Sequence, residues 1–249
     1  MKKTSQLTAK IFVTSIVALG ACTQANAFIN GEIVRISNNS NALQSFANTA
    51  DLVAESNPIL DTTSPSGAGY ANDGWFYLDG LVYRTTGSDE IFSYNSQANF
   101  LAGTGILLGS VTDYRDDEFF TYDFGGQEKI VRVSDGDNVT IYDTVTAFID
   151  GSGTSANNDF AVGARGNYDD DGYYSWQGEI FRVGNGSGQI LKYANWNAFL
   201  ANDSTELGAV AAYAHDGFFV VPEPSTYAAI FGVVALSFAM CRRRIAVSS

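Results

Sequence analysis

The chain has 249 residues, of which 45% are apolar and 13% aromatic, which is enough to build a substantial hydrophobic core. Between Phe28 and Val221 there are 8 basic and 26 acidic side chains, a balance of −18. Phosphate contacts depend on Lys and Arg, so this balance argues against nucleic acid and anionic membrane surfaces as partners of the central region. Gly is frequent at 25 residues and Pro scarce at 4, which favours strands joined by tight turns over helices.

The N-terminal residues 1–27 have the pattern of a secretory signal peptide. Lys2 and Lys3 precede an apolar run from Ile11 to Ala21, and the small residues Ala25 and Ala27 then form a signal-peptidase site. Cleavage there makes Phe28 the first mature residue.

The two cysteines, Cys22 and Cys241, lie in terminal apolar segments, so the central region has no disulfide framework and no cysteine-ligated zinc site. The stretch Leu19 to Cys22 resembles a bacterial lipobox. Attachment of a lipid to Cys22 is therefore an alternative to cleavage after Ala27, and the sequence leaves both open.

The central region, residues 28–221, is built from an internal repeat. Its motif reads Tyr, two variable residues, Asp, Gly or Glu, and two aromatics, and the copies are Tyr70–Phe76, Tyr114–Phe120, Tyr168–Tyr174 and Tyr213–Phe219. The acids of the motif are Asp73, Asp117, Asp171 and Asp216.

Further positions follow each Asp at nearly constant steps. They are an Arg (Arg84, Arg132, Arg182), a Tyr (Tyr94, Tyr142, Tyr193) and, six residues later, a Phe (Phe100, Phe148, Phe199). The partial first unit has Arg35, and places Phe46 and Leu52 at the Tyr and Phe positions. The period is about 45 residues in the regular units, and insertions in the middle unit fall at Gly-rich turns.

Within a unit, short apolar runs bounded by Gly, Asp and Asn predict strands. In the middle unit we expect strands at Ser110–Tyr114, Glu118–Tyr122, Lys129–Val133 and Val139–Tyr142. Four antiparallel strands in about 45 residues are typical of a β-propeller blade. The predicted fold is therefore all-β, a propeller of four blades, with a β-sandwich as the alternative.

The expected units are residues 28–69, 70–113, 114–167 and 168–212, followed by closing strands at 213–221. The first unit lacks its first two strands, and the C-terminal stretch from Gly208 to Val221 carries two strands of the next unit. We therefore expect these ends to pair and close the ring, because an open ring would expose strand edges.

The C-terminus, residues 222–249, has three parts: Pro222-Glu223-Pro224 directly after Val221, an apolar segment over 227–241, and the basic Arg242, Arg243 and Arg244. This tail resembles the PEP-CTERM sorting signal, which implies processing by an exosortase near Pro-Glu-Pro and association with exopolysaccharide or biofilm material. The arginines predict a cytoplasmic end for the segment. A permanent transmembrane anchor is the alternative.

Asp-rich turns at Asp116–Glu118, Asp135–Asp137 and Asp169–Asp171 offer oxygen ligands for calcium, but Asp is also an ordinary turn residue. The repeated arginines could ring a central channel and bind an anion, or form structural pairs. Aromatic side chains such as Trp75, Trp176 and Trp196 could stack on sugars, or fill the space between blades.

The sequence recommends no catalytic residues. His215 is the single histidine, and no nucleophile elbow, metal-hydrolase spacing or phosphate-binding loop is present. We therefore expect a protein that is not an enzyme and needs no cofactor: an exported envelope or matrix protein, held in the inner membrane before processing and then released to the cell surface. A carbohydrate-binding propeller is the alternative, and a secreted hydrolase has the least support.

Overall fold

A computed structural model describes residues 32–37, 42–63, 73–111, 114, 117–134, 138–156, 171–184, 186–210 and 216–221. The predicted signal peptide with Ala25, Ala27 and Phe28 lies outside these residues. So does the predicted tail with Pro222, Glu223, Pro224, the segment 227–241 and Arg242–Arg244. Within the described part, no helix is both long enough and apolar enough to cross a membrane.

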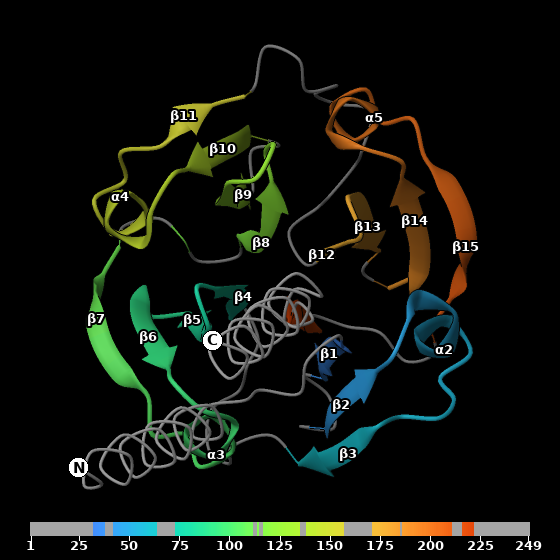
Figure 1. Cartoon of the computed structure of the whole chain (residues 1–249), viewed down its shortest axis with the longest axis horizontal. Coiled ribbons are helices and arrows are strands. Elements are labelled where there is room, and N and C mark those ends of the chain that lie inside the picture. The colour runs from blue at the N-terminus through green and yellow to red at the C-terminus, as the bar shows by residue number, and fades with distance from the viewer. Residues whose placement is uncertain are drawn as a thin grey trace, which may run out of the picture.

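Four antiparallel sheets of four strands surround a common centre, confirming the predicted four-bladed β-propeller (Figure 1). From the centre outward, the first blade contains β16 (Gly217–Val221), β1 (Glu32–Ile36), β2 (Ala42–Phe46) and β3 (Leu60–Thr63). The second contains β4 (Gly74–Leu78), β5 (Leu81–Thr85), β6 (Glu90–Tyr94) and β7 (Ile106–Ser110). The third contains β8 (Glu118–Asp123), β9 (Glu128–Ser134), β10 (Asn138–Tyr142) and β11 (Thr154–Ser155). The fourth contains β12 (Gly172–Trp176), β13 (Glu179–Val183), β14 (Gln189–Tyr193) and β15 (Thr205–Ala209).

The ring is closed by strands from opposite ends of the chain. The first blade pairs β1 with β16, from Glu32 opposite Val221 to Ile36 opposite Gly217. The four inner strands, β16, β4, β8 and β12, each contact the inner strands on both sides. They approach so closely that a Cβ on Gly74 would lie 2.1 Å from the Phe119 ring, and one on Gly217 would lie 2.3 Å from Trp75.

Two strand predictions were wrong: the first strand expected in the middle unit, Ser110–Tyr114, and the pair of strands expected from Gly208 to Val221 for the closing blade. Ser110 ends β7 of the second blade, and Val111 and Tyr114 are not in a strand. They are apolar because they are buried between blades, not because they alternate along a ladder. The C-terminal stretch likewise gives the first blade one strand, because Gly208 belongs to β15 of the fourth blade.

Each blade contains a short helix between its third and fourth strands, which the composition argument did not predict. These are α2 (Thr49–Val53), α3 (Gln97–Leu101), α4 (Val145–Ile149) and α5 (Trp196–Leu200). Each begins after a residue whose side chain accepts a hydrogen bond from the backbone N–H three residues on: Asn48, Ser96, Thr144 and Asn195. This N-cap satisfies one of the free donors of the first turn.

The repeated Tyr and Phe meet edge to face where the third strand passes into the helix. The ring centroids are 5.5 Å apart for Tyr94 and Phe100, and 5.3 Å for Tyr142 and Phe148, with interplanar angles of 88° and 89°. Phe148 also packs on Phe76 of the preceding blade. All four hydrophobic clusters join two neighbouring blades in this way, so the core lies between blades.

The repeated Asp and Arg form one buried ion pair per blade. Each Asp lies just before the inner strand, its side chain is at most 2% exposed, and it accepts from the Nε of the Arg on the next strand. The distances are 2.6 Å for Arg35 and Asp216 and 2.7 Å for Arg84 and Asp73, and Arg132 and Arg182 pair with Asp117 and Asp171 in the same way.

Candidate functional site

A pocket of about 340 Å³ opens where the inner strands of three blades end. Its floor contains residues at the fourth position of their strands, Thr121 of β8, Ser175 of β12 and Val220 of β16. The equivalent residue of β4 is the much larger Tyr77. Small side chains at three of four symmetry-related positions leave space that large ones would fill, since protein interiors otherwise pack tightly.

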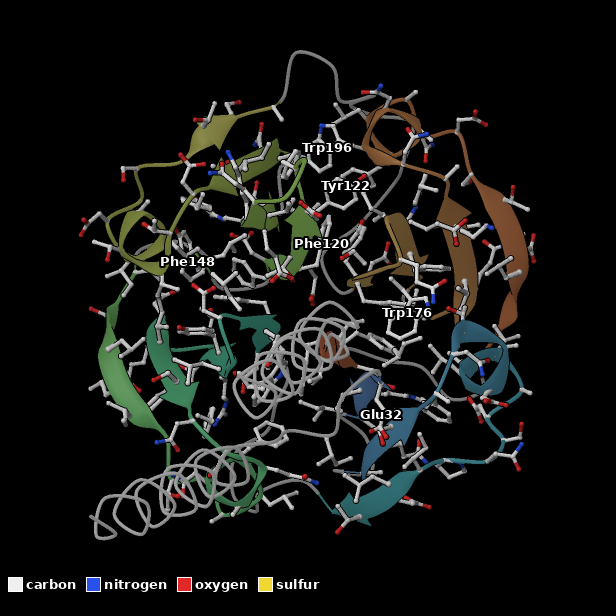
Figure 2. The ribbon with its side chains drawn as sticks, viewed as in Figure 1. Glu32, Phe120, Tyr122, Phe148, Trp176 and Trp196 are labelled. Carbon is white, nitrogen blue, oxygen red and sulfur yellow. The ribbon has the colours of Figure 1, made fainter. Side chains whose placement is uncertain are left out.

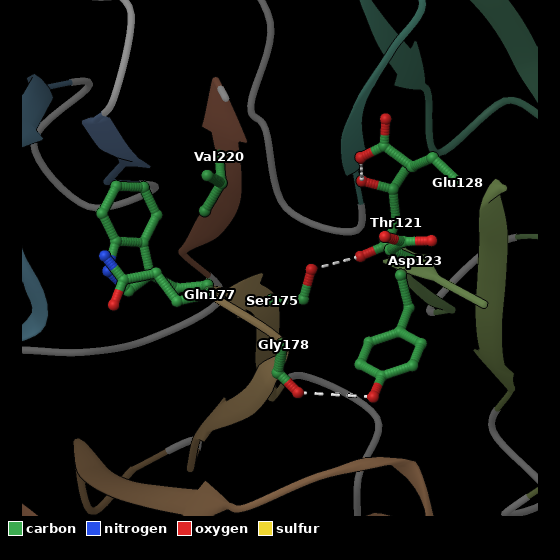
Figure 3. A pocket seen from close by; sticks show the side chains of 9 residues that line it. Thr121, Asp123, Glu128, Ser175, Gln177, Gly178 and Val220 are labelled. Carbon is green, nitrogen blue, oxygen red and sulfur yellow. Dashed lines mark hydrogen bonds between the residues drawn. The ribbon is translucent and has the colours of Figure 1, made fainter. Parts of the chain in front are cut away.

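Hydrogen bonds fix the polar wall of this pocket (Figure 3). The Thr121 hydroxyl donates to Glu128 Oε1 at 2.8 Å, and the Ser175 hydroxyl donates to the carbonyl oxygen of Thr121. The Tyr122 hydroxyl donates to the carbonyl oxygen of Gly178 at 3.3 Å and accepts from the backbone N–H of Trp196. The third and fourth blades are thus held together at the pocket by side chains of β8 and β12.

Two carboxylates, Asp123 at the end of β8 and Glu128 at the start of β9, give the pocket a negative charge. Burial, together with the charges of Asp79 and Asp123, raises the pKa of Glu128, while its hydrogen bond with Thr121 opposes that shift. Every Lys and Arg in the described part of the chain is paired with an acid outside the pocket. The pocket therefore presents hydrogen-bond acceptors and suits a ligand that carries hydrogen-bond donors.

Trp176 supplies the aromatic surface of the pocket. Its ring is half-buried against the cluster between the fourth and first blades. The other two tryptophans serve packing. Trp75 is 2% exposed in the core, and the Trp196 ring packs against Phe124 and against Tyr122, near which it is labelled in Figure 2. The expectation that tryptophans fill the space between blades is thus confirmed for Trp75, and Trp176 lines a pocket.

Gln177 lies at the rim in an unfavourable backbone conformation. With Gly178 it forms the two-residue turn between β12 and β13, and its φ is +54°. The same turn in the second blade is Asp79-Gly80, and left-handed turns of this kind favour Asp, Asn or Gly. Among the described residues, Gln177 and Glu55 are the two that hold a positive φ and are neither Gly, Asn nor Asp, and of these Gln177 lines the pocket.

The polar groups that the sequence highlighted are mostly structural. All four repeated arginines pair with the repeated aspartates, which accounts for them without a ring of anion-binding charges. Asp117 and Asp171, from two of the Asp-rich turns, are among these partners, while Asp135–Asp137 and His215 lie outside the described residues. Within the described ranges, no group of three or more His, Cys, Asp or Glu side chains is placed to hold a metal ion.

Trp176 was named from the sequence as a possible surface for sugars, but the other pocket residues were not predicted from the repeat, because the pocket depends on positions where the units differ. The signal was present: the fourth residue of the inner strand is Tyr, Thr, Ser and Val in the four blades, where the preceding two positions are aromatic throughout. Chemically, the site presents acceptors and an aromatic face. The hydroxyl of Ser175 is committed to a backbone carbonyl.

Neither a search against protein families nor a search of curated proteins finds a match. Among solved structures, the chain is similar to the dihydro-heme d1 dehydrogenase NirN, solved in complex with DHE, at 14% identity and a TM-score of 0.26. That similarity covers 78% of this chain and 39% of NirN. The assignment of the fold rests on the strand pairing within this chain.

Proposed function

We propose that this chain is an exported envelope or extracellular-matrix protein, sorted by an exosortase through Pro222-Glu223-Pro224, whose propeller is a non-catalytic interaction module. The observation that carries the proposal is the junction at Val221. This residue is buried at the end of the closing strand, and the Pro-Glu-Pro motif follows at once. The tail is thus attached directly to the element that completes the propeller, as suits a signal that is removed after the domain has crossed the membrane.

The test is the triple replacement of Pro222, Glu223 and Pro224 by Ala in the full-length chain, expressed in a host with an exosortase. The unprocessed form should accumulate in the inner-membrane fraction, while the native chain is shortened and released. Replacement of Ser225 by Ala, just beyond the motif, is the matched control. Normal shortening and release of the triple variant would contradict the sorting proposal.

A second candidate function is carbohydrate binding, and the pocket favours it. A pocket lined by a half-buried tryptophan, two carboxylates and an amide is a suitable surface for a polyhydroxylated ring, because the indole packs on C–H groups while the acceptors bind hydroxyls. The geometry supports one site per molecule, not one per blade, since the residues that match Trp176 at the fifth position of the other inner strands are Leu78, Tyr122 and Val221. Its non-catalytic character is supported by the hydrogen bonds that occupy Ser175 and Tyr122.

Trp176→Ala in the full-length chain tests this candidate on a glycan array. We expect loss of glycan binding with little change in melting temperature, because Trp176 is only partly buried. Phe92→Ala, which removes a partly buried aromatic of β6 in the second blade, away from the pocket lining, is the matched variant and should leave binding intact. Equal binding by native protein and Trp176→Ala would rule out this pocket as the site.

A further inference from the structure

The pocket is lined by two exposed carboxylates, Asp123 and Glu128, and by Trp176, and every Lys and Arg in the described part of the chain is paired with an acid elsewhere. Asp123 accepts from the backbone N–H of Gly126, and Glu128 accepts from the Thr121 hydroxyl. These single hydrogen bonds use one oxygen of each group. Lys129, the residue after Glu128, directs its ammonium to Asp143 at 2.7 Å.

We propose that this pocket, at the ends of β8, β12 and β16, binds a sugar unit with a free, protonated amino group, such as a glucosamine residue of a glycan. This inference rests on carbohydrate binding as the function of the pocket. An ammonium group donates three hydrogen bonds and carries the charge that two neighbouring carboxylates attract. Trp176 contributes both a packing surface for the ring and a π face that favours cations.

The same hydrogen bonds and charges predict how tightly other sugars bind relative to the amino sugar. A neutral sugar forms hydrogen bonds with Asp123 and Glu128 but brings no charge, so it binds more weakly than the amino sugar. A uronate brings a third negative charge next to two others and is repelled. The raised pKa of Glu128, caused by burial and by nearby acids, is consistent with carboxylates that repel one another when no ligand is bound.

The experiment compares glucosamine tetramers with N-acetylglucosamine tetramers, which share the ring and the linkage and differ in the charge on nitrogen. Binding to the full-length chain in detergent is measured by calorimetry at fixed ionic strength. We expect the glucosamine tetramer to bind about ten-fold more tightly, the effect of one charge-assisted hydrogen bond. Glu128→Gln and Asp123→Asn, which keep the shape and the structural hydrogen bonds, should each remove most of that preference.

Glu206→Gln is the matched control, because Glu206 is an exposed acid on the outer strand β15. It removes one negative charge, as Glu128→Gln does, and should leave the preference unchanged. If Glu206→Gln weakens glucosamine binding as much as Glu128→Gln, the attraction is a property of the whole acidic surface and the inference is overturned. Equal or tighter binding of the N-acetylated tetramer also overturns it, while carbohydrate binding stands. If no tetramer binds, neutral or charged, the carbohydrate function itself fails.

Discussion

At the scale of single residues, the repeated Asp and Arg are a structural device. Each Asp lies just before an inner strand, where the chain enters the crowded centre, and the Arg of the next strand holds it in place. A charge buried to this degree is tolerated because its partner is present, and removal of one partner leaves the other uncompensated.

Asp171→Ala tests this role. It should lower the free energy of unfolding by about 3 kcal/mol, because Arg182 is left partly buried without its carboxylate. Chemical denaturation measures the loss. Glu179→Ala, which removes the partner of Lys192 in a half-exposed pair, should cost less than about 1 kcal/mol. Similar losses of unfolding free energy in the two variants would show that burial of an ion pair does not determine its contribution to stability.

Glu32 has a different effect on stability, which depends on pH. Its side chain is buried at the start of β1, its Oε2 has no hydrogen-bond partner, and burial raises its pKa above the ordinary value of 4.5. A hydrogen bond with Ser45 opposes the shift. The native state therefore keeps this proton to a higher pH than the unfolded state, and stability falls as pH rises through that interval.

Glu32→Gln should accordingly raise the free energy of unfolding at neutral pH. The difference from the native chain should vanish below about pH 3, where both folded and unfolded Glu32 are protonated. Urea denaturation at a series of pH values provides the measurement. A variant that is less stable than the native chain at neutral pH would indicate that Glu32 is held ionised.

At the scale of elements, the four outermost strands differ in how they are protected from pairing with another chain. β15 carries Glu206, β3 carries Asp61, and β11 is two residues long. β7 is five residues long and has no charged side chain. Its Ile106 and Leu107 are 60% and 54% exposed. Charges and short edges are the usual defences of natural sheets, so β7 is the edge most open to self-association.

Leu107→Glu places on β7 the charge that β15 has at the equivalent position, because Leu107 and Glu206 each lie opposite the first residue after the bulge, Phe92 in β6 and Leu191 in β14. This variant should raise the concentration at which light scattering detects aggregates. The reverse change, Glu206→Leu, should lower it by opening a second edge. If neither variant moves the threshold, the outer edges do not control association.

At the scale of the whole molecule, the ring depends on β16. Phe218, Phe219 and Val221 are buried, and each contributes about 1.5–3 kcal/mol of burial. Together they amount to a large part of the total stability of a typical domain, about 5–15 kcal/mol. Loss of this strand would also expose the edge of β1 and separate β12 from β4, the inner strands that β16 contacts on either side.

A chain truncated after Val210 should therefore lose its cooperative thermal transition. Truncation after Val221 removes only the tail and should retain that transition, so the pair of truncations isolates the contribution of the closing strand. Calorimetry distinguishes them. A sharp transition in the shorter chain at an unchanged temperature would mean that the propeller does not need to close.

The repeat in the sequence was sufficient to predict an all-β propeller of four blades closed by its ends, because each unit must bury the same apolar face against its neighbours. The segment between the repeated Tyr and Phe also indicated the short helix of each blade, which was not predicted. A capping residue stands two places after each Tyr or its equivalent, as Asn48 does after Phe46, and predicts the start of the short helix. Assignment of the strands failed at Val111 and Tyr114, because burial between blades produces the same apolar pattern as a half-buried strand.

The sequence by itself determined the number of blades, the closing partners and the residues of the core, since these follow from a periodic pattern and from the need to bury it. Only the tertiary structure decided where the pocket lies. Thr121, Ser175 and Val220 are far apart along the chain and come together because three inner strands end at one place. A repeat reports what its units share, whereas the pocket arises where three units carry small residues in place of a large one.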